Sequence, residues 1–448
     1  MSGPNNAIEI IPNKLYWISD RAPPRNQPNS YYFCIDNELV YQPFYLDFGP
    51  LNIGMTYKFC TELERLTRNP SYSAYKIYHF TSLLPNKRAN AAYLMGAFQI
   101  LVLNKTADEA WQPFASLPPF EGFRDAGGTN CPYRCSILNC LRGLEKAIKL
   151  GWFDMATFNV KDYEFYEKVE NGDWNWIIPG KMLAFACPSP TQIDQQGFRV
   201  WTPEDYVPLF KQIGITAVVR LNNKTYEAER FTRNGIRHYD LYFLDGSVPS
   251  NEILTEFLRI AEREPGGLAV HCKAGLGRTG TLIGIYAMKH FRFRAEDFIG
   301  YIRLCRPGSV LGPQQQFLCD MQDRVFSWGD ELRNENELAT GISKLNVRDS
   351  NNEEQKTPMS PEDKFIMMHG DKGQAERLVN AKKSNQNSPV TSPFVPKEKV
   401  SAQNRANSTS PDTKKVKAGL SIFDKSPVRH TTPNSTRISN VKKPGFLR

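Results

Sequence analysis

Cys272 is the only one of the nine cysteines with an arginine, Arg278, six positions further along the chain. It ends an apolar run at 268–272 and opens a loop containing Gly275 and Gly277, after which a helical pattern begins. Glycines before a helix let several backbone N–H groups point at one place, where they and the helix dipole bind an anion such as phosphate. The same field favours the thiolate form of a cysteine. The segment therefore predicts a thiolate beside a phosphate-binding loop.

The residues that follow Cys272 supply what phosphoryl transfer to sulfur needs. Arg278 carries a planar guanidinium that can hold two phosphoryl oxygens, and the Thr279 hydroxyl can donate to the sulfur when it leaves. The loop residues predicted to bind phosphate, together with Thr279, are Lys273, Ala274, Gly275, Leu276 and Gly277. The alternative, a buried core cysteine beside a structural arginine, requires all these residue types to coincide by chance.

Attack on a phosphate ester also needs an acid that protonates the departing oxygen. Asp245 leaves an apolar run and enters a Gly-Ser-Val-Pro turn, as an acid on a loop at the edge of a sheet would. Asp240 is the competitor, but it alternates within the preceding strand pattern and is better explained as structural. We therefore expect Asp245 to be the general acid.

These segments resemble the protein-tyrosine phosphatase superfamily, whose signature is HC-x(5)-R-[ST]. The runs HCKAGLGRTG, FLDGSVPS and RPGSVLGPQQQF and the connector YEFYEKVENGDWNWI are similar to the mitotic-exit dual-specificity phosphatases, the cell-division-cycle-fourteen family. The resemblance covers nearly all of residues 7–335. It implies that Cys272 is the nucleophile, Arg278 the phosphate clamp and Asp245 the general acid and later base.

The resemblance also implies a residue that orients the hydrolytic water. One of three consecutive glutamines would do so: Gln314, Gln315 or Gln316.

It further implies a preference for phosphoserine followed by proline and a nearby basic residue, with phosphotyrosine accepted too. Glu164, Glu167 and Asp173 would attract that base, and the two glutamates are three positions apart on one helical face. A solvated acidic helix face is the alternative. Proline-directed phosphorylation is what cyclin-dependent kinases add, so the resemblance implies a role in cell-cycle exit and cytokinesis.

Two other functions compete with this reading. Phosphoinositide phosphatases have a nearly identical loop, but those that this chain resembles carry a second lysine where Leu276 stands, so a protein phosphoester is favoured. A catalytically dead scaffold is the other, and the presence of Cys272, Arg278 and Asp245 argues against it.

The elements around Cys272 form an alternating pattern. Helices are expected at 202–214, 226–235, 250–264 and 277–291, with strands at 215–222 and 268–272 and an extended run at 236–245. An earlier unit has expected strands at 31–35 and 39–48 and helices at 55–68, 89–104 and 135–151. The pattern predicts an α/β fold with mixed, mostly parallel sheets flanked by helices.

The resemblance assigns two tandem dual-specificity-phosphatase-like domains, of which only the second is catalytic. The predicted boundaries are 1–156 for a non-catalytic domain, 157–172 for a linker helix, 173–335 for the catalytic domain and 336–448 for a tail. No cysteine of the first unit has an arginine at the right spacing, which agrees with this division.

The tail differs in composition from the rest. All 7 Trp, 19 Tyr and 9 Cys precede it, and its 20 Lys and Arg against 11 Asp and Glu account for the whole chain's net charge of +9. Such a segment is expected to be disordered. It contains seven Ser/Thr-Pro steps that proline-directed kinases could phosphorylate: Thr357, Ser360, Ser388, Ser392, Ser410, Ser426 and Thr432. Phosphorylated Ser426 could occupy the enzyme's own acidic groove.

No metal or cofactor is expected, because the histidines and cysteines lack metal-ligand spacing, and Cys131, Cys135 and Cys140 are better explained as one helix face. Neither a membrane span nor a secretory signal is expected. The balanced charge of the first 335 residues gives no reason to expect a nucleic-acid partner.

The short basic runs at 414–417 and 442–443 would suit nuclear import, and the segment 361–370 would suit an export patch. The resemblance implies cytoplasm and nucleus, with the spindle, centrosome or midbody; the oligomeric state stays open.

Overall fold

The computed structural model describes residues 6–342, except 26, 129–130, 132 and 195–196, and residues 373–387. The seven Ser/Thr-Pro steps, the two basic runs and the export patch lie outside these residues. Among the described helices, none is both long and apolar enough to cross a membrane.

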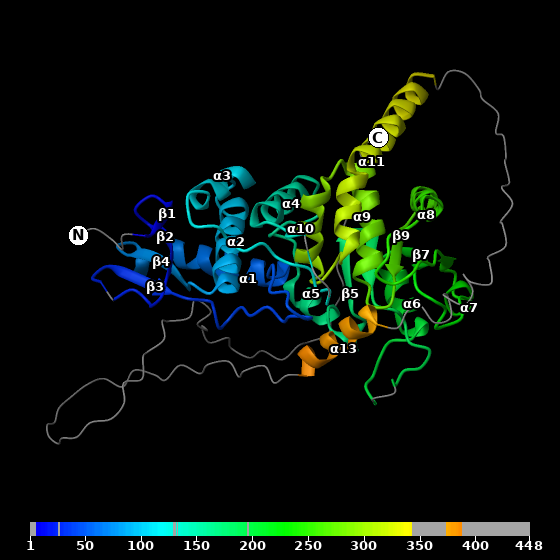
Figure 1. The fold of residues 1–448 in the computed structure, drawn as a ribbon, viewed down its shortest axis with the longest axis horizontal. Coiled ribbons are helices and arrows are strands. Elements are labelled where there is room, and N and C mark those ends of the chain that lie inside the picture. The colour runs from blue at the N-terminus through cyan, green and yellow to red at the C-terminus, as the bar shows by residue number, and fades with distance from the viewer. Residues whose placement is uncertain are drawn as a thin grey trace, which may run out of the picture.

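Two sheets with helices on their faces form the body of the molecule (Figure 1). The first has the order β1 (Ile8–Ile11), β2 (Leu15–Asp20), β4 (Lys76–Ser82) and β3 (Ser30–Phe33). The second has the order β5 (Trp174–Ile178), β6 (Met182–Phe185), β9 (Gly267–His271), β7 (Ile215–Arg220) and β8 (Arg237–Asp240). In each sheet only the first pair is antiparallel, which confirms the predicted mixed, mostly parallel α/β fold.

The helices follow the sequence patterns closely where capping signals exist. Thr202 and Asp205 form the capping box of α6 (Pro203–Gln212), and Ser250 caps α8 (Asn251–Arg263). The other helices of the body are α1 (Ile53–Arg68), α2 (Pro85–Leu101), α3 (Ala107–Trp111), α4 (Ile137–Lys149), α5 (Val160–Tyr166), α7 (Glu229–Thr232), α9 (Gly277–Phe291), α10 (Ala295–Cys305) and α11 (Pro313–Ile342). Single 3₁₀ turns occur at η1 (Pro70–Tyr72), η2 (Gln112–Phe114) and η3 (Val169–Asn171).

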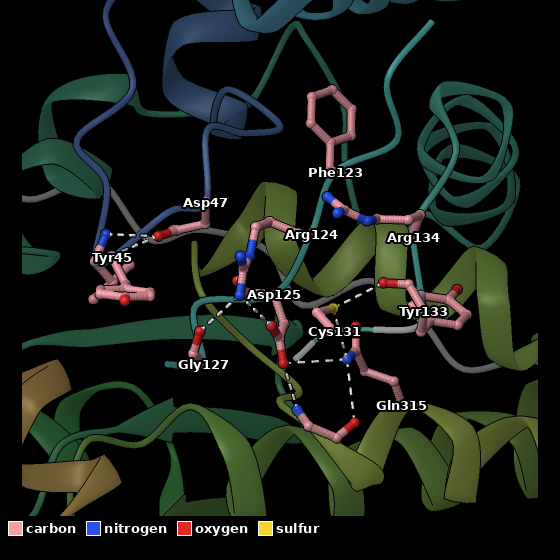
Figure 2. A network of polar contacts seen from close by, with 12 residues as sticks. Tyr45, Asp47, Phe123, Arg124, Asp125, Gly127, Cys131, Tyr133, Arg134 and Gln315 are labelled. Carbon is pink, nitrogen blue, oxygen red and sulfur yellow. Dashed lines mark hydrogen bonds and ion pairs between the residues drawn. The ribbon is translucent and has the colours of Figure 1, made fainter. Parts of the chain in front are cut away.

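The strand expected at 39–48 is not formed. The Asp47 carboxylate instead accepts hydrogen bonds from the backbone N–H groups of Phe44 and Tyr45, the latter shown in Figure 2, and from the Tyr41 hydroxyl. These bonds fold the segment into a turn. Pro43 within the run lacks the N–H that a strand would use. The prediction of a strand at 39–48 was therefore wrong, because it relied on the apolar and aromatic content of the segment alone.

The extended run expected at 236–245 is also shorter, because β8 ends at Asp240 and the chain then leaves the sheet. The connector helix is likewise only the seven residues of α5, followed by η3 and a left-handed Gly172 with φ of +104°. The shorter helix brings Asp173 round toward the second sheet.

The two sheet units share a core that α4 and α10 join. A Cβ on Gly300 of α10 would lie 2.8 Å from the Cα and N of Cys140, and one on Gly143 of α4 would lie 2.3 Å from the Asp297 carbonyl oxygen. The two helices therefore approach backbone to backbone, and one cluster of buried apolar side chains runs through both units. This close packing of α4 against α10 fixes the position of one sheet unit relative to the other.

The described residues depart from the expected disorder of the tail at two places. Helix α11 continues to Ile342. A separate helix, α13 (Gln374–Asn387), lies below α5 and β5 in the view of Figure 1, where it is orange, and contacts both sheet units. The reason for α13 is tertiary contact, because Ala375 and Leu378 are buried against the body. Composition carries no information on such a contact.

Candidate active site

Cys272 follows the central strand of the second sheet. Strand β9 is hydrogen-bonded to β6 and β7 and fully buried, and α9 begins at Gly277, so the loop 272–276 lies between a fixed strand and a helix N-terminus. His271 Nδ1 is 3.0 Å from the Cys272 carbonyl oxygen, and His271 Nε2 is 2.7 Å from the Tyr226 hydroxyl. Burial lowers the pKa of His271 well below its ordinary value, so the neutral ring holds the first loop carbonyl.

Arg306 fixes the rest of the loop. This fully buried guanidinium donates to the carbonyl oxygens of Gly275 (2.8 Å) and Ala274 (2.9 Å), and to Asn175 Oδ1 (2.8 Å). Because the loop carbonyls are turned toward Arg306, the loop N–H groups are left for the opposite side, where an anion would bind. Gly275 has a φ of +67°, and a Cβ there would lie 2.0 Å from the Phe185 carbonyl oxygen, so glycine is required.

Arg278 is almost completely buried at the start of α9. Its Nη1 donates to the carbonyl oxygens of Phe243 (2.9 Å) and Leu221 (3.3 Å), and its Nη2 lies 3.4 Å from Asp245 Oδ1. Asp245 follows β8 and Arg278 follows β9, so the structure brings the two side chains together at the carboxyl edge of the second sheet.

The two candidate acids have different surroundings. Asp240 accepts two hydrogen bonds from the buried Arg220, at 2.6 Å and 2.9 Å, and so has a structural partner. Asp245 lies in the turn after β8, beside Arg278, and its second oxygen, Oδ2, accepts the backbone N–H of Ala375 at 2.9 Å. Of the two carboxylates, the one beside Arg278 is Asp245.

The remaining loop residues are placed as follows. Thr279 Oγ1 is buried and has no hydrogen-bond partner among the described residues. The Lys273 carbonyl accepts from the Cys187 N–H, and its ammonium lies 4.0 Å from Glu376. Leu276 is buried in an apolar cluster with Ala274. Leu276 is thus an apolar residue at the position where the phosphoinositide phosphatases considered above carry a second lysine.

The three glutamines point in different directions. Gln314 Oε1 accepts the Leu311 N–H, its Nε2 donates to the Ser247 carbonyl, and a Cβ on Gly277 would lie 2.7 Å from Oε1. Gln316 bonds to Asp320 on the exposed side of α11. Gln314 therefore borders both the phosphate loop and the turn that carries Asp245.

Gln315 belongs to a network between the two sheet units (Figure 2). Its Oε1 accepts from Arg303 at 2.6 Å, and its Nε2 donates to Asp125 at 3.3 Å and to the Gly312 carbonyl at 3.2 Å. Asp125 also accepts the Gly312 N–H at 2.5 Å. These bonds join the first unit to the turn before α11, so Gln315 holds that turn in place.

The acidic residues of the connector divide into two groups. Glu164 is ion-paired with Lys58 of α1 and half exposed. Glu167 lines a cavity whose walls include Asn52, Asn175 and Lys382. Asp173 does not line it but is ion-paired with Lys382, and both Lys382 and Asp173 act electrostatically on Glu167. The structure thus brings two of the three predicted carboxylates together and pairs the third with the first unit.

Electrostatics distinguishes Glu167 from Asp173. Burial raises the pKa of Glu167 to about 7, against the opposing influence of Lys382. Burial would raise the pKa of Asp173 as well, but Arg306 (2.8 Å) and Lys382 hold it below its ordinary value. Asp173 has a φ of +46°, which aspartate tolerates better than most residues. Asp173 is therefore a fixed anion joined to the phosphate loop through Arg306.

Comparison with known proteins identifies the family. The model of the dual specificity protein phosphatase N-terminal half matches residues 9–147, and that of the dual specificity phosphatase catalytic domain matches residues 203–324. The dual specificity protein phosphatase CDC14A of Homo sapiens is 46% identical over 404 residues, which cover 86% of this chain and 68% of that protein. The chain belongs to the CDC14 family of protein phosphatases.

Other CDC14 proteins are similar to it as well. CDC14C of Homo sapiens is 38% identical over 392 residues, covering 84% of this chain and 88% of that protein. The tyrosine-protein phosphatase cdc-14 of Caenorhabditis elegans is 38% identical over 384 residues, and the match spans 80% of this chain and about half, 53%, of that protein. The chain is accordingly a protein phosphatase, as the sequence analysis predicted.

Sequence reasoning missed Arg306, which comes from the end of α10, 34 residues after Cys272. The signal that could have found it is the Arg-Pro-Gly turn at 306–308, where a basic residue leaves a helix before a sharp bend. It also missed Asp125 and Arg303, which lie in apolar or glycine-rich surroundings without local pattern. The hydrogen-bond partners of Asp125, Gly312 and Gln315, are 187 and 190 residues away, so no spacing rule applies to Asp125.

Proposed function

We propose that the protein hydrolyses phosphoserine and phosphothreonine esters that precede proline, with preference for a nearby basic residue, and also hydrolyses phosphotyrosine. The observation that supports this is the link between Asp173 and the phosphate loop, because Arg306 contacts both. A carboxylate suited to a basic side chain therefore adjoins the place where the phosphate would bind. Glu167 adds a second carboxylate close to Lys382, the lysine that is paired with Asp173.

The proposed reaction has two steps. The Cys272 thiolate attacks phosphorus, the ester P–O bond breaks, and Asp245 gives its proton to the leaving oxygen. Arg278 and the loop N–H groups hold the phosphoryl oxygens during both steps. The Asp245 carboxylate then takes a proton from a water whose oxygen attacks the phosphocysteine, which releases inorganic phosphate and the thiolate. Gln314 is our candidate for orienting that water.

The biological role follows from the substrate. Serine and threonine before proline are the sites of cyclin-dependent kinases, so we propose that the protein reverses their phosphorylation in cell-cycle exit and cytokinesis. We further propose location in the cytoplasm and nucleus, with the spindle, centrosome or midbody. The support is the family resemblance and, for the nucleus, the basic runs at 414–417 and 442–443.

The substrate preference is tested with charge reversal in the groove. The variant Glu167→Lys should lose kcat/KM on a phosphoserine-proline peptide with a following lysine, while a small aryl phosphate is hydrolysed as before. Glu256→Lys on α8 is the control for charge change alone. Assays contain a chelator, since no proposed step uses a metal. Equal losses on both substrates would refute the groove.

A further inference from the structure

Helix α13 covers the phosphate loop with an apolar face. Leu378, 5% exposed, packs in a cluster with Ala274 and Leu276 of the loop, Leu311 before α11 and Ala126 of the first unit. These contacts come from both sheet units and from the active site itself. The helix is therefore bound at the mouth of the site.

The N-terminal end of α13 engages the proposed general acid. The Ala375 N–H donates to Asp245 Oδ2 at 2.9 Å. The other oxygen of the same carboxylate, Oδ1, faces Arg278. The proposed general acid must reach the leaving oxygen of a substrate, so docked α13 occupies an oxygen that catalysis needs.

The C-terminal half of α13 fills the acidic groove with lysines. Lys382 is ion-paired with Asp173, and Lys383 with Asp194 of the loop before α6. Both lysine side chains are only 18% exposed. Asn385 completes the contact with a hydrogen bond of 3.0 Å to the Pro43 carbonyl oxygen of the first unit. Lys382 thus stands where the proposed function places the basic residue of a substrate.

We propose that this surface, built from Asp173, Asp194 and the apolar cluster, is a docking site for residues 374–387 of the same chain, and that docked α13 competes with phosphoprotein substrates. The proposal rests on the proposed function, because it takes the groove and Asp245 as parts of the substrate site. The occupant is a basic amphipathic helix with two adjacent lysines. The proposal also gives Asp194 a role, because Asp194 would bind a second basic residue of the occupant. No sequence pattern had singled out Asp194.

The test compares three full-length proteins: the wild type, Leu378→Asp and Asn380→Asp. Both variants add one negative charge to α13, but Leu378 is buried against the body and Asn380 is exposed. Each protein is assayed on a small aryl phosphate and on a phosphoserine-proline peptide with two following lysines. Amide hydrogen exchange is measured over residues 374–387.

We expect Leu378→Asp to raise kcat/KM about tenfold on the peptide, the equivalent of removing ~1.4 kcal/mol of docking free energy. A smaller rise is expected on the aryl phosphate, and exchange of the α13 amides should become faster. Asn380→Asp should behave as the wild type in both measurements. Three active proteins with equal kcat/KM and equal exchange would overturn the docking proposal while leaving the proposed function intact. Absence of hydrolysis by all three would overturn the proposed function first.

Discussion

Arg306 is the residue on which the shape of the phosphate loop depends most, although it lies outside the loop. One guanidinium bonds two loop carbonyls, Asn175 and Asp173. Lysine at this place would keep the charge but lose the planar set of donors that reaches all four partners. Arg306 is therefore a positioning residue for both the phosphate site and the groove.

Arg306→Lys is expected to lower kcat/KM about 10²-fold on every substrate, since small displacements of a catalytic constellation cost that much. The inhibition constant of inorganic phosphate should rise in parallel, measured at a temperature where circular dichroism shows the variant folded. Unchanged phosphate inhibition in a folded but slow variant would contradict the positioning role.

Asp245 and Asp240 form a matched pair for testing acid catalysis. Asp245→Asn should lower kcat about 10²–10⁴-fold on phosphoserine peptides and much less on aryl phosphates with acidic leaving groups, which need no proton. Asp240→Asn removes the charged partner of buried Arg220 and should instead cost about 1 kcal/mol of stability, because the Asp240 side chain is half exposed. The two are separated by plotting kcat against leaving-group acidity and by urea unfolding. A steep leaving-group dependence in Asp240→Asn alone would reverse the assignment.

Glu167 should make the substrate preference depend on pH. Burial raises the pKa of this carboxyl to about 7, so the group is neutral below that pH and negatively charged above it. The ratio of kcat/KM for a basic peptide to that for its alanine counterpart should therefore rise between pH 6 and pH 8, by about fivefold for ~1 kcal/mol of ion pairing.

Glu167→Gln is the control for this pH dependence. The glutamine variant should show a flat ratio over the same range, at the low value. A rise that persists in Glu167→Gln would assign the titration to another group.

At the scale of elements, the helices α4 and α10 hold the two sheet units in one arrangement. Gly300→Val should destabilise the protein by about 1–3 kcal/mol, because a Cβ there meets the Cys140 backbone, which cannot move aside as a side chain would. Urea unfolding measures the loss, and Lys149→Val at the exposed end of α4 should stay within ~0.5 kcal/mol of the wild type. A Gly300→Val protein as stable as the control would show that the helices can separate freely.

Local signals explain which elements the sequence could predict. The capped helices α6 and α8 and the apolar strand β9 are specified by neighbouring residues, and so is the loop after Cys272. The run 39–48 was mispredicted because its turn depends on the Asp47 carboxylate competing with a strand ladder. Arg306, Asp125 and the position of α13 depend on partners more than 30 residues away, and single-sequence patterns do not record such pairs.

At the scale of the whole molecule, side chains of the first unit contact the candidate site of the second unit. Each sheet has an inner parallel strand that is followed by a helix: β4 precedes α2 in the first unit, and β9 precedes α9 in the second. The residues after β4 are Leu83-Leu84-Pro85, whereas those after β9 are Cys272 and its loop. The first unit instead supplies Asn52 at the Glu167 cavity, Asp125 under the Gln315 turn and Ala126 beneath α13. The groove is thus a property of the two units together.

The central claim, that Cys272 carries the phosphoryl group, is tested most directly by trapping. The full-length protein is mixed with excess phosphoserine-proline peptide, quenched in acid within the first turnovers, digested and analysed by mass spectrometry. We predict phosphate on the peptide that contains Cys272 and complete loss of both label and turnover in Cys272→Ser. Phosphate found on another residue, or hydrolysis that continues in Cys272→Ser, would contradict the account.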